Sequence, residues 1–76
     1  MSRWMPCKRR DFIQRLKKLG FTGPFPGTKH EFMRYEHYKQ TIPNNSYYDV
    51  NELKMLIGQI ENRLGRKISA DEWNNL

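Results

Sequence analysis

Apolar residues first form a regular pattern near the start of the chain. They are Phe12, Ile13, Leu16 and Leu19. This spacing places all four side chains along one stripe of an α-helix. Pro6 suits the entry to such a helix. Gly20 can adopt the left-handed conformation that ends many helices. The pattern therefore predicts an amphipathic helix over residues 8–19.

A longer apolar stripe lies in the second half of the chain. Its members are Leu53, Leu56, Ile57, Ile60 and Leu64. Asp49, followed three residues later by Glu52, forms a capping-box pattern that marks a helix start. Gly65 suits its end. Gly58 lies inside this helix, where glycine costs about 1 kcal/mol relative to alanine. We therefore expect Gly58 to permit close packing.

A second capping-box pattern begins at Ser69 and is completed by Glu72. It predicts a short third helix that continues through Trp73. We expect Trp73 and Leu76 to dock on the core.

The segment between the two long helices has the pattern of short strands. Residues 21–27 hold two prolines and two glycines, which favour an edge strand or an irregular extended segment. Residues 29–36 contain no breaker and predict a strand. Residues 39–42 predict another strand, which Pro43 stops. The connections are a turn at residues 36–38 and a loop at residues 44–46.

The predicted order of elements is α-β-β-β-α with a short C-terminal helix. Two amphipathic helices can bury their stripes against one face of a three-stranded antiparallel sheet, which gives a two-layer α+β domain. The other face of the sheet would be free to meet a partner. For a chain of 76 residues we expect one domain, 1–76, with a core over about 7–65 and a C-terminal extension over 66–76.

Charge adds a candidate class of partner. The formal net charge is +6, and residues 1–39 carry ten basic and three acidic residues, against four and five in residues 40–76. A basic half beside a nearly neutral half favours a surface that binds a polyanion, for which RNA or DNA is the usual partner. A basic surface that serves only solubility is the alternative.

Composition also excludes several classes of protein. Cys7 is the single cysteine, so it cannot form a disulfide within the chain, and no second cysteine or paired-histidine spacing indicates a zinc site. No apolar run approaches the roughly 18–20 residues that cross a bilayer. The basic N-terminus lacks the apolar core of a signal peptide. We expect a cytoplasmic protein with no membrane partner and no small-molecule cofactor.

The stretch Gly27-Thr28-Lys29-His30-Glu31-Phe32 is the strongest candidate for a functional site. A histidine can move protons near neutral pH, and a lysine beside it can hold a phosphate as a point charge. The glycine lets the backbone turn tightly or approach a ligand. A zinc-protease motif is excluded because Arg34, and not a histidine, stands four residues after His30. An ordinary strand histidine is the alternative.

Four features of this chain, in this order, resemble those of one known family. They are Leu19-Gly20-Phe21 at the end of the first helix, Gly27-Thr28-Lys29-His30-Glu31-Phe32, Thr41-Ile42-Pro43, and the closing helix from Val50 to Leu64. The second is similar to the Gly-Ser-x-His element, and the third to the short strand ending in Val-Pro or Ile-Pro, of the HicA toxins of bacterial toxin–antitoxin pairs. The resemblance covers about residues 7–65. Thr28 replaces the family's serine, and Lys29 stands where some relatives have the first of two adjacent histidines.

This resemblance implies a fold like that of double-stranded-RNA-binding domains and the activity of an mRNA interferase. Such a toxin is a metal-independent endoribonuclease, inhibited by a HicB-like antitoxin protein, and by position His30 would be its catalytic histidine. RNA carries its own nucleophile, the 2′-hydroxyl, so cleavage needs a base, a cation for the phosphate and an acid for the leaving oxygen. His30 would be the base, or base and acid in turn. A non-catalytic RNA-binding module, or a decayed toxin that still binds its antitoxin, is the alternative, and a plain interaction domain is a third.

The expected RNA contacts are Gly27, Thr28 and Lys29 beside the histidine, Arg34 and Lys39 on the strands, and Lys8 and Arg9 at the start of the first helix. In strand geometry His30 shares a face with Phe32 and Arg34, while Lys29 points the other way. Lys29 can therefore join the site only if the strand begins after it or bulges there.

Other reactive or aromatic residues have simpler interpretations. We expect His37 to be solvated in its turn and Cys7 to be a helix-start or packing residue and not a nucleophile. Tyr47-Tyr48 is the best candidate among the aromatic residues for stacking on bases. The remaining aromatic residues could also stack but are expected mainly to pack: Phe21, Phe25, Tyr35 and Tyr38.

Overall fold

The computed structural model describes residues 2–76, with three helices and five strands among them. The helices are α1 (Arg9–Lys18), α2 (Val50–Leu64) and α3 (Ala70–Asn74). The strands are β1 (Cys7–Lys8), β2 (Thr22–Phe25), β3 (Glu31–Tyr35), β4 (Tyr38–Ile42) and β5 (Tyr47–Tyr48). The predicted α-β-β-β-α order and the short C-terminal helix are confirmed. The two-residue strands β1 and β5 were not predicted.

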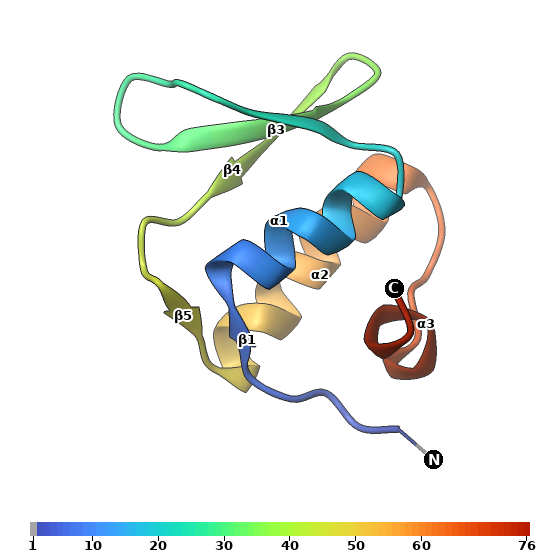
Figure 1. Cartoon of the computed structure of the whole chain (residues 1–76). Coiled ribbons are helices and arrows are strands. Elements are labelled where there is room, and N and C mark those ends of the chain that lie inside the picture. Colours follow the sequence, from blue (N-terminus) through green and yellow to red (C-terminus); the bar gives the residue numbers. More distant parts are fainter. Residues whose placement is uncertain (1) are drawn as a thin grey trace.

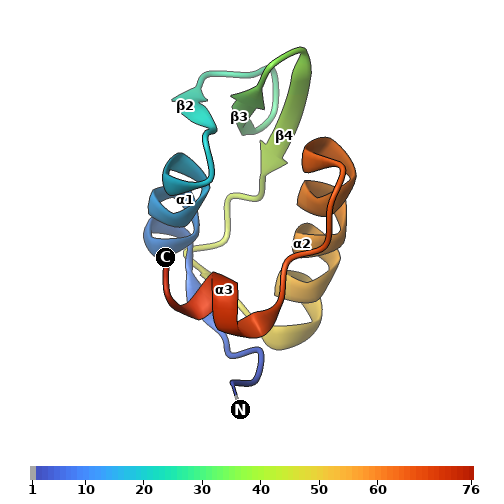
Figure 2. The same ribbon diagram turned by 90° about the vertical axis from the view of Figure 1, so that its right-hand side faces the viewer.

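The three longer strands form an antiparallel sheet in the order β2-β3-β4. This sheet lies on one side of α1 and α2, as Figures 1 and 2 show from two directions. Met33 of β3 and Ile42 of β4 point toward the helices and are fully buried. No helix among residues 2–76 covers the opposite face. The domain is therefore the predicted two-layer α+β arrangement with one free sheet face.

Local signals account for α1 and for the way it leads into the sheet. Its buried residues are Phe12, Ile13 and Leu16, as the stripe predicted. Gly20 follows with φ 107°. The amides of Gly20 and Phe21 donate to the carbonyls of Lys17 and Leu16, which is the Schellman motif. This turn places Phe21 in the core immediately before β2.

Both predicted N-terminal caps are present. The Asp49 carboxylate accepts a hydrogen bond from the Glu52 amide at 2.8 Å, and the Ser69 hydroxyl accepts one from the Glu72 amide at 3.1 Å. These bonds satisfy amides that the first turn of each helix leaves without partners. The Glu72 carboxylate pairs with Arg66 at 2.7 Å. That ion pair ties the α2–α3 connection to α3.

The two glycines of the second helical region differ in their roles. Gly65 ends α2 in the left-handed conformation, with φ 73°, as predicted. The expectation that Gly58 permits close packing is wrong. A Cβ atom built on Gly58 would meet nothing within 4 Å, so the space beside this residue is open.

The core extends beyond the predicted limit at residue 65. Ile68 and Trp73 are 3% and 0% exposed, and the Trp73 ring lies 5.5 Å from that of Phe12. Leu76 is partly buried against the same cluster. Docking of Trp73 and Leu76 is thereby confirmed, and residues 66–76 complete the core.

β3 and β4 form a hairpin with its turn within the predicted residues 36–38. Tyr35 pairs with Tyr38, and Glu36, with φ 54°, makes the turn between them. β2 is an edge strand whose register shifts between Thr22 and Phe25, since its prolines and glycines disrupt a regular ladder.

Candidate functional site

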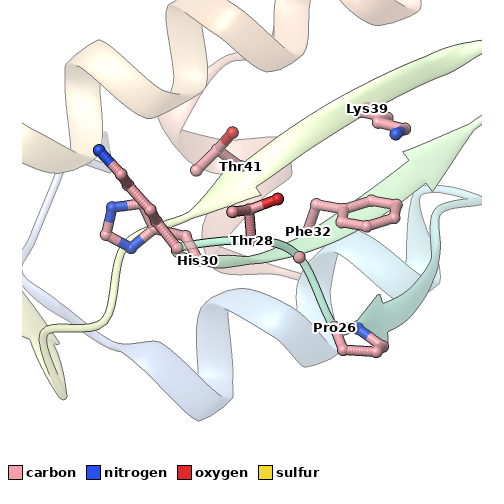
Figure 3. Close-up of a pocket in the computed structure, with 8 residues that line it drawn as sticks. Pro26, Thr28, His30, Phe32, Lys39 and Thr41 are labelled. Carbon is pink, nitrogen blue, oxygen red and sulfur yellow. The ribbon is translucent and has the colours of Figure 1, made fainter.

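The predicted stretch from Gly27 to Phe32 forms the β2–β3 loop and the first residues of β3. With β4 it lines an open cleft at the free face of the sheet (Figure 3). The lining residues are Pro26, Gly27, Thr28, Lys29, His30, Phe32, Lys39 and Thr41. His30 lies at one end of the cleft and Lys39 at the other, with Thr28, Thr41 and Phe32 between them. Five of the predicted site residues therefore share one surface.

Lys29 meets the condition for joining the site. β3 begins at Glu31, so Lys29 and His30 belong to the loop and are not subject to the alternation of a strand. The predicted strand over 29–36 is too long at its N-terminal end. Lys29 and His30 both line the cleft and are both exposed. A cation and an imidazole are therefore available together.

Gly27 allows the β2–β3 loop to fold closely on itself. A Cβ atom built on Gly27 would clash with the backbone carbonyl oxygen of His30. The close approach that glycine permits is therefore to the protein's own backbone. Gly27 holds the loop closed, so that the backbone of His30 is brought back against the start of the turn.

Arg9 anchors the other side of His30. Its guanidinium forms an ion pair with Glu31, the residue after His30, and its Nε donates to the Pro43 carbonyl at 3.0 Å. The Tyr48 hydroxyl donates to the same carbonyl at 2.7 Å. Arg9 thus ties α1 to the start of β3 and the end of β4. Among the predicted RNA contacts in the described residues, Arg9 is the one whose side chain forms an ion pair within the protein.

The remaining cations of the free face are unpaired. Lys29, Arg34 and Lys39 are exposed, and none forms an ion pair within residues 2–76. Lys39 Nζ lies 4.9 Å from the centroid of the Phe32 ring, within the range of a cation–π contact. These charges are free to bind an anion, Lys29 and Lys39 in the cleft and Arg34 beside it.

Besides Arg9, two further predicted RNA contacts lie outside this cleft. Arg34 is paired across the strands with Lys39, on the same sheet face but not in the cleft lining. Lys8 is exposed at the start of α1, where it lines a second open cavity with Arg9 and Arg10. The predicted RNA contacts therefore lie in three places: in the cleft, beside the cleft on the sheet, and at the start of α1.

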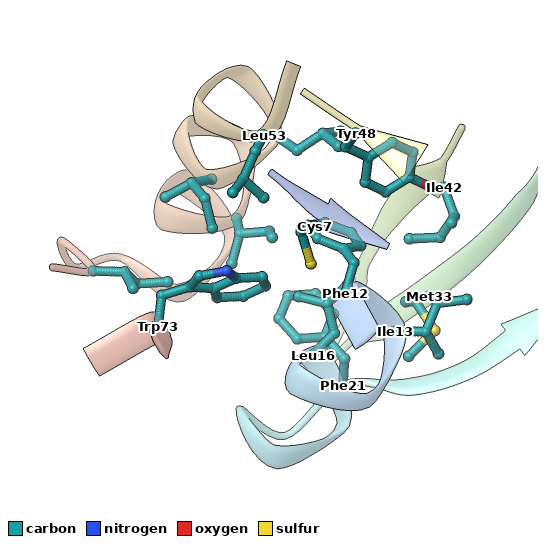
Figure 4. Close-up of a cluster of buried hydrophobic side chains, with 14 residues drawn as sticks. Cys7, Phe12, Ile13, Leu16, Phe21, Met33, Ile42, Tyr48, Leu53 and Trp73 are labelled. Carbon is teal, nitrogen blue, oxygen red and sulfur yellow. The ribbon is translucent and has the colours of Figure 1, made fainter. Parts of the chain in front are cut away.

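The other two reactive side chains behave as predicted. His37 is exposed in the β3–β4 turn. Cys7 lies inside the core (Figure 4), and burial raises the pKa of its thiol, with Arg15 opposing the shift. A buried thiol with a raised pKa is a poor nucleophile, so Cys7 is a packing residue.

The Tyr47-Tyr48 prediction is wrong for Tyr48. Its ring is fully buried and packs edge-on against Phe12 at 5.3 Å, because β5 pairs with β1 and its successive side chains point to opposite sides. The sequence did not indicate that another aromatic pair lies beside the cleft. This pair is Phe25 and Phe32, whose ring centroids are 5.6 Å apart. Only the cross-strand register of β2 and β3 brings these two rings together.

Comparison with protein-family models, curated proteins and solved structures finds no significant match to this chain. The resemblance to HicA toxins therefore stays a prediction based on the motifs. No helix within residues 2–76 has the length and apolar character to cross a bilayer. The same residues contain no cluster of three or more histidine, cysteine, aspartate or glutamate side chains placed to hold a metal ion.

Proposed function

We propose that this protein is an endoribonuclease toxin of the HicA type that cleaves mRNA without a metal, with His30 as general base and acid. The observation that carries the proposal is the open cleft that joins an exposed histidine to the unpaired cations Lys29 and Lys39. These are the groups that phosphodiester cleavage by an RNA 2′-hydroxyl requires.

The chemistry follows from the substrate's own nucleophile. Neutral His30 takes the proton of the 2′-hydroxyl, whose oxygen attacks the adjacent phosphorus while the bond to the 5′-oxygen breaks. The leaving oxygen takes a proton from the imidazolium, and the products are a 2′,3′-cyclic phosphate and a 5′-hydroxyl. Lys29 and Lys39 offset the charge that develops on the phosphoryl oxygens. Lys8 and Arg34 extend the positive surface along the RNA backbone.

The proposed partner is a HicB-like antitoxin protein in the same cytoplasm. A net charge of +6 favours an acidic partner, because complementary charge steers association and excludes wrong partners. An antitoxin that covers the cleft would prevent RNA from reaching His30.

Expression of the chain in bacterial cells tests the proposal. We expect wild type to arrest growth and degrade mRNA, and His30→Ala to abolish both effects while remaining folded. His37→Ala is the matched control, since His37 is an exposed histidine in the hairpin turn and should keep both effects. Undiminished toxicity of folded His30→Ala contradicts the proposal.

A non-catalytic RNA-binding module is the second candidate. It is favoured by the lack of a partner for His30, which makes no side-chain hydrogen bond within the described chain, while the adjacent Glu31 is engaged by Arg9. This candidate predicts RNA binding that weakens with salt, with no cleavage by the purified protein.

A further inference from the structure

The free face of the sheet carries two neighbouring aromatic rings that the core does not use. Phe25 and Phe32 are cross-strand partners, and their ring planes are inclined by 38°. Met33 is fully buried, so the preceding side chain, Phe32, points to the opposite face. Phe25 is 39% exposed. A pair of rings in contact with each other and with water is suited to receive a ligand.

The charges around these rings identify the kind of ligand. Arg34 and Lys39 are paired across β3 and β4 on the same face, and neither forms an ion pair within residues 2–76. Flat rings flanked by free cations suit a nucleobase with its phosphates, because aromatic side chains stack on bases while cations bind the backbone. An apolar peptide would use the rings but would leave the cations without partners.

The platform is also ordered before a ligand arrives. Phe25 lies between Pro24 and Pro26, whose rings restrict the backbone on both sides. The Phe32 ring, on β3, packs against the Phe25 ring. Lys39 Nζ lies 4.9 Å from the centroid of the Phe32 ring. Little conformational entropy is therefore lost when a base stacks on Phe25. Phe32 and Lys39 also line the cleft of His30, so the stacking surface and the cleft are continuous.

We propose that Phe25, supported by Phe32, is a stacking platform for one unpaired nucleobase, and that the substrate is single-stranded RNA. This inference rests on the proposed RNA-cleaving function and names the form of its substrate. A base inside a duplex has both faces covered by its neighbours, so only an unstacked base can use the platform. Arg34 and Lys39 then hold the phosphates that flank the stacked base.

Equilibrium binding to a fully 2′-O-methylated single-stranded RNA tests the platform, because this oligonucleotide has no free 2′-hydroxyl and cannot be cleaved. We expect Phe25→Leu to weaken binding by about 5- to 100-fold, the loss typical of one stacked base. Phe25→Tyr keeps the ring and should bind as wild type. Met55→Ala is the control for loss of an exposed apolar side chain, because Met55 is exposed on α2 and has no place on the free face of the sheet, and it should also bind as wild type.

The outcomes separate the platform from the proposed function. Tighter binding of the matching duplex than of the single strand, or undiminished binding by folded Phe25→Leu, overturns the platform while leaving His30-dependent cleavage intact. Impaired capture of a protein partner by Phe25→Leu, with RNA binding unchanged, also overturns it. A wild-type protein that binds no RNA overturns both proposals. Quenching of 2-aminopurine in the oligonucleotide on binding wild type gives a readout that does not depend on any variant folding.

Discussion

The position of His30 depends on contacts made by residues near it in the chain. Gly27 lets the loop close on the His30 carbonyl, and Arg9 holds Glu31 on the other side. The imidazole itself is exposed in the cleft. A side chain that acts on a mobile polymer must be reachable while its backbone stays fixed, and this arrangement provides both.

Replacing Gly27 tests this role of the loop. In Gly27→Ala the new methyl group clashes with the His30 carbonyl, so the loop must rearrange and His30 must move. We expect the cleavage rate to fall by about 100-fold, since small misplacements of a catalytic group have effects of that size. The free energy of unfolding should fall by only about 1–3 kcal/mol. Cleavage kinetics and denaturant unfolding measure the two effects, and an unchanged cleavage rate contradicts the role given to Gly27.

Tyr48 gives a pH dependence of stability. Burial raises the pKa of Tyr48 from 10.0 to about 12, with the Arg9 guanidinium opposing the shift. Because the folded value is the higher one, the stabilisation is fully present below pH 10 and is lost as the pH rises through 12. We expect the free energy of unfolding to fall over this range more steeply for wild type than for Tyr48→Phe. Denaturant unfolding at several pH values compares them, and equal slopes contradict the assignment.

Residue types were easier to predict than residue contacts. The sequence indicated His30, Lys29 and Gly27 because histidine, lysine and glycine have distinct chemistry that is visible in isolation. It did not indicate the ion pair of Arg9 with Glu31, whose members lie 22 residues apart. Such a contact depends on how α1 packs on the sheet, which no local pattern records.

At the scale of elements, the helices were the most predictable part. Their starts and ends are set by residues within one turn, such as Asp49 for α2 and Gly20 for α1. β1 and β5 were not predictable because two residues show no alternation, and their pairing joins Cys7 to Tyr48 across about half of the chain. Burial of Tyr48 follows from that pairing and was missed with it.

Gly58 allows a direct stability test of α2. The position is helical, and an added Cβ would meet nothing within 4 Å. We therefore expect Gly58→Ala to raise the free energy of unfolding by about 0.5–1 kcal/mol, because alanine loses less backbone entropy on folding. Gly65→Ala serves as the opposite control, since φ 73° disfavours any side chain there. A destabilised Gly58→Ala protein would show that this surface of α2 is packed.

At the scale of the whole molecule, the cleft lies almost entirely in the basic half of the sequence, and the two later helices lie in the nearly neutral half. Every residue that lines the cleft falls between Pro26 and Thr41, while α2 and α3 complete the core. The two-layer arrangement was predictable because both helices show one apolar stripe and the sheet needs one covered face. The side chains that meet on the free face were not predictable. The register that pairs Phe25 with Phe32 includes an irregularity in β2, which the sequence pattern does not show.

The central claim is that His30 cleaves RNA, and the most direct measurement is incubation of the purified, metal-free protein with mRNA in the presence of a chelator. Wild type and His37→Ala should both produce fragments that end in a 2′,3′-cyclic phosphate. Folded His30→Ala should produce none while still binding the RNA. Cleavage by His30→Ala at the wild-type rate, or intact RNA with wild type, would contradict the assignment of His30 as the catalytic residue.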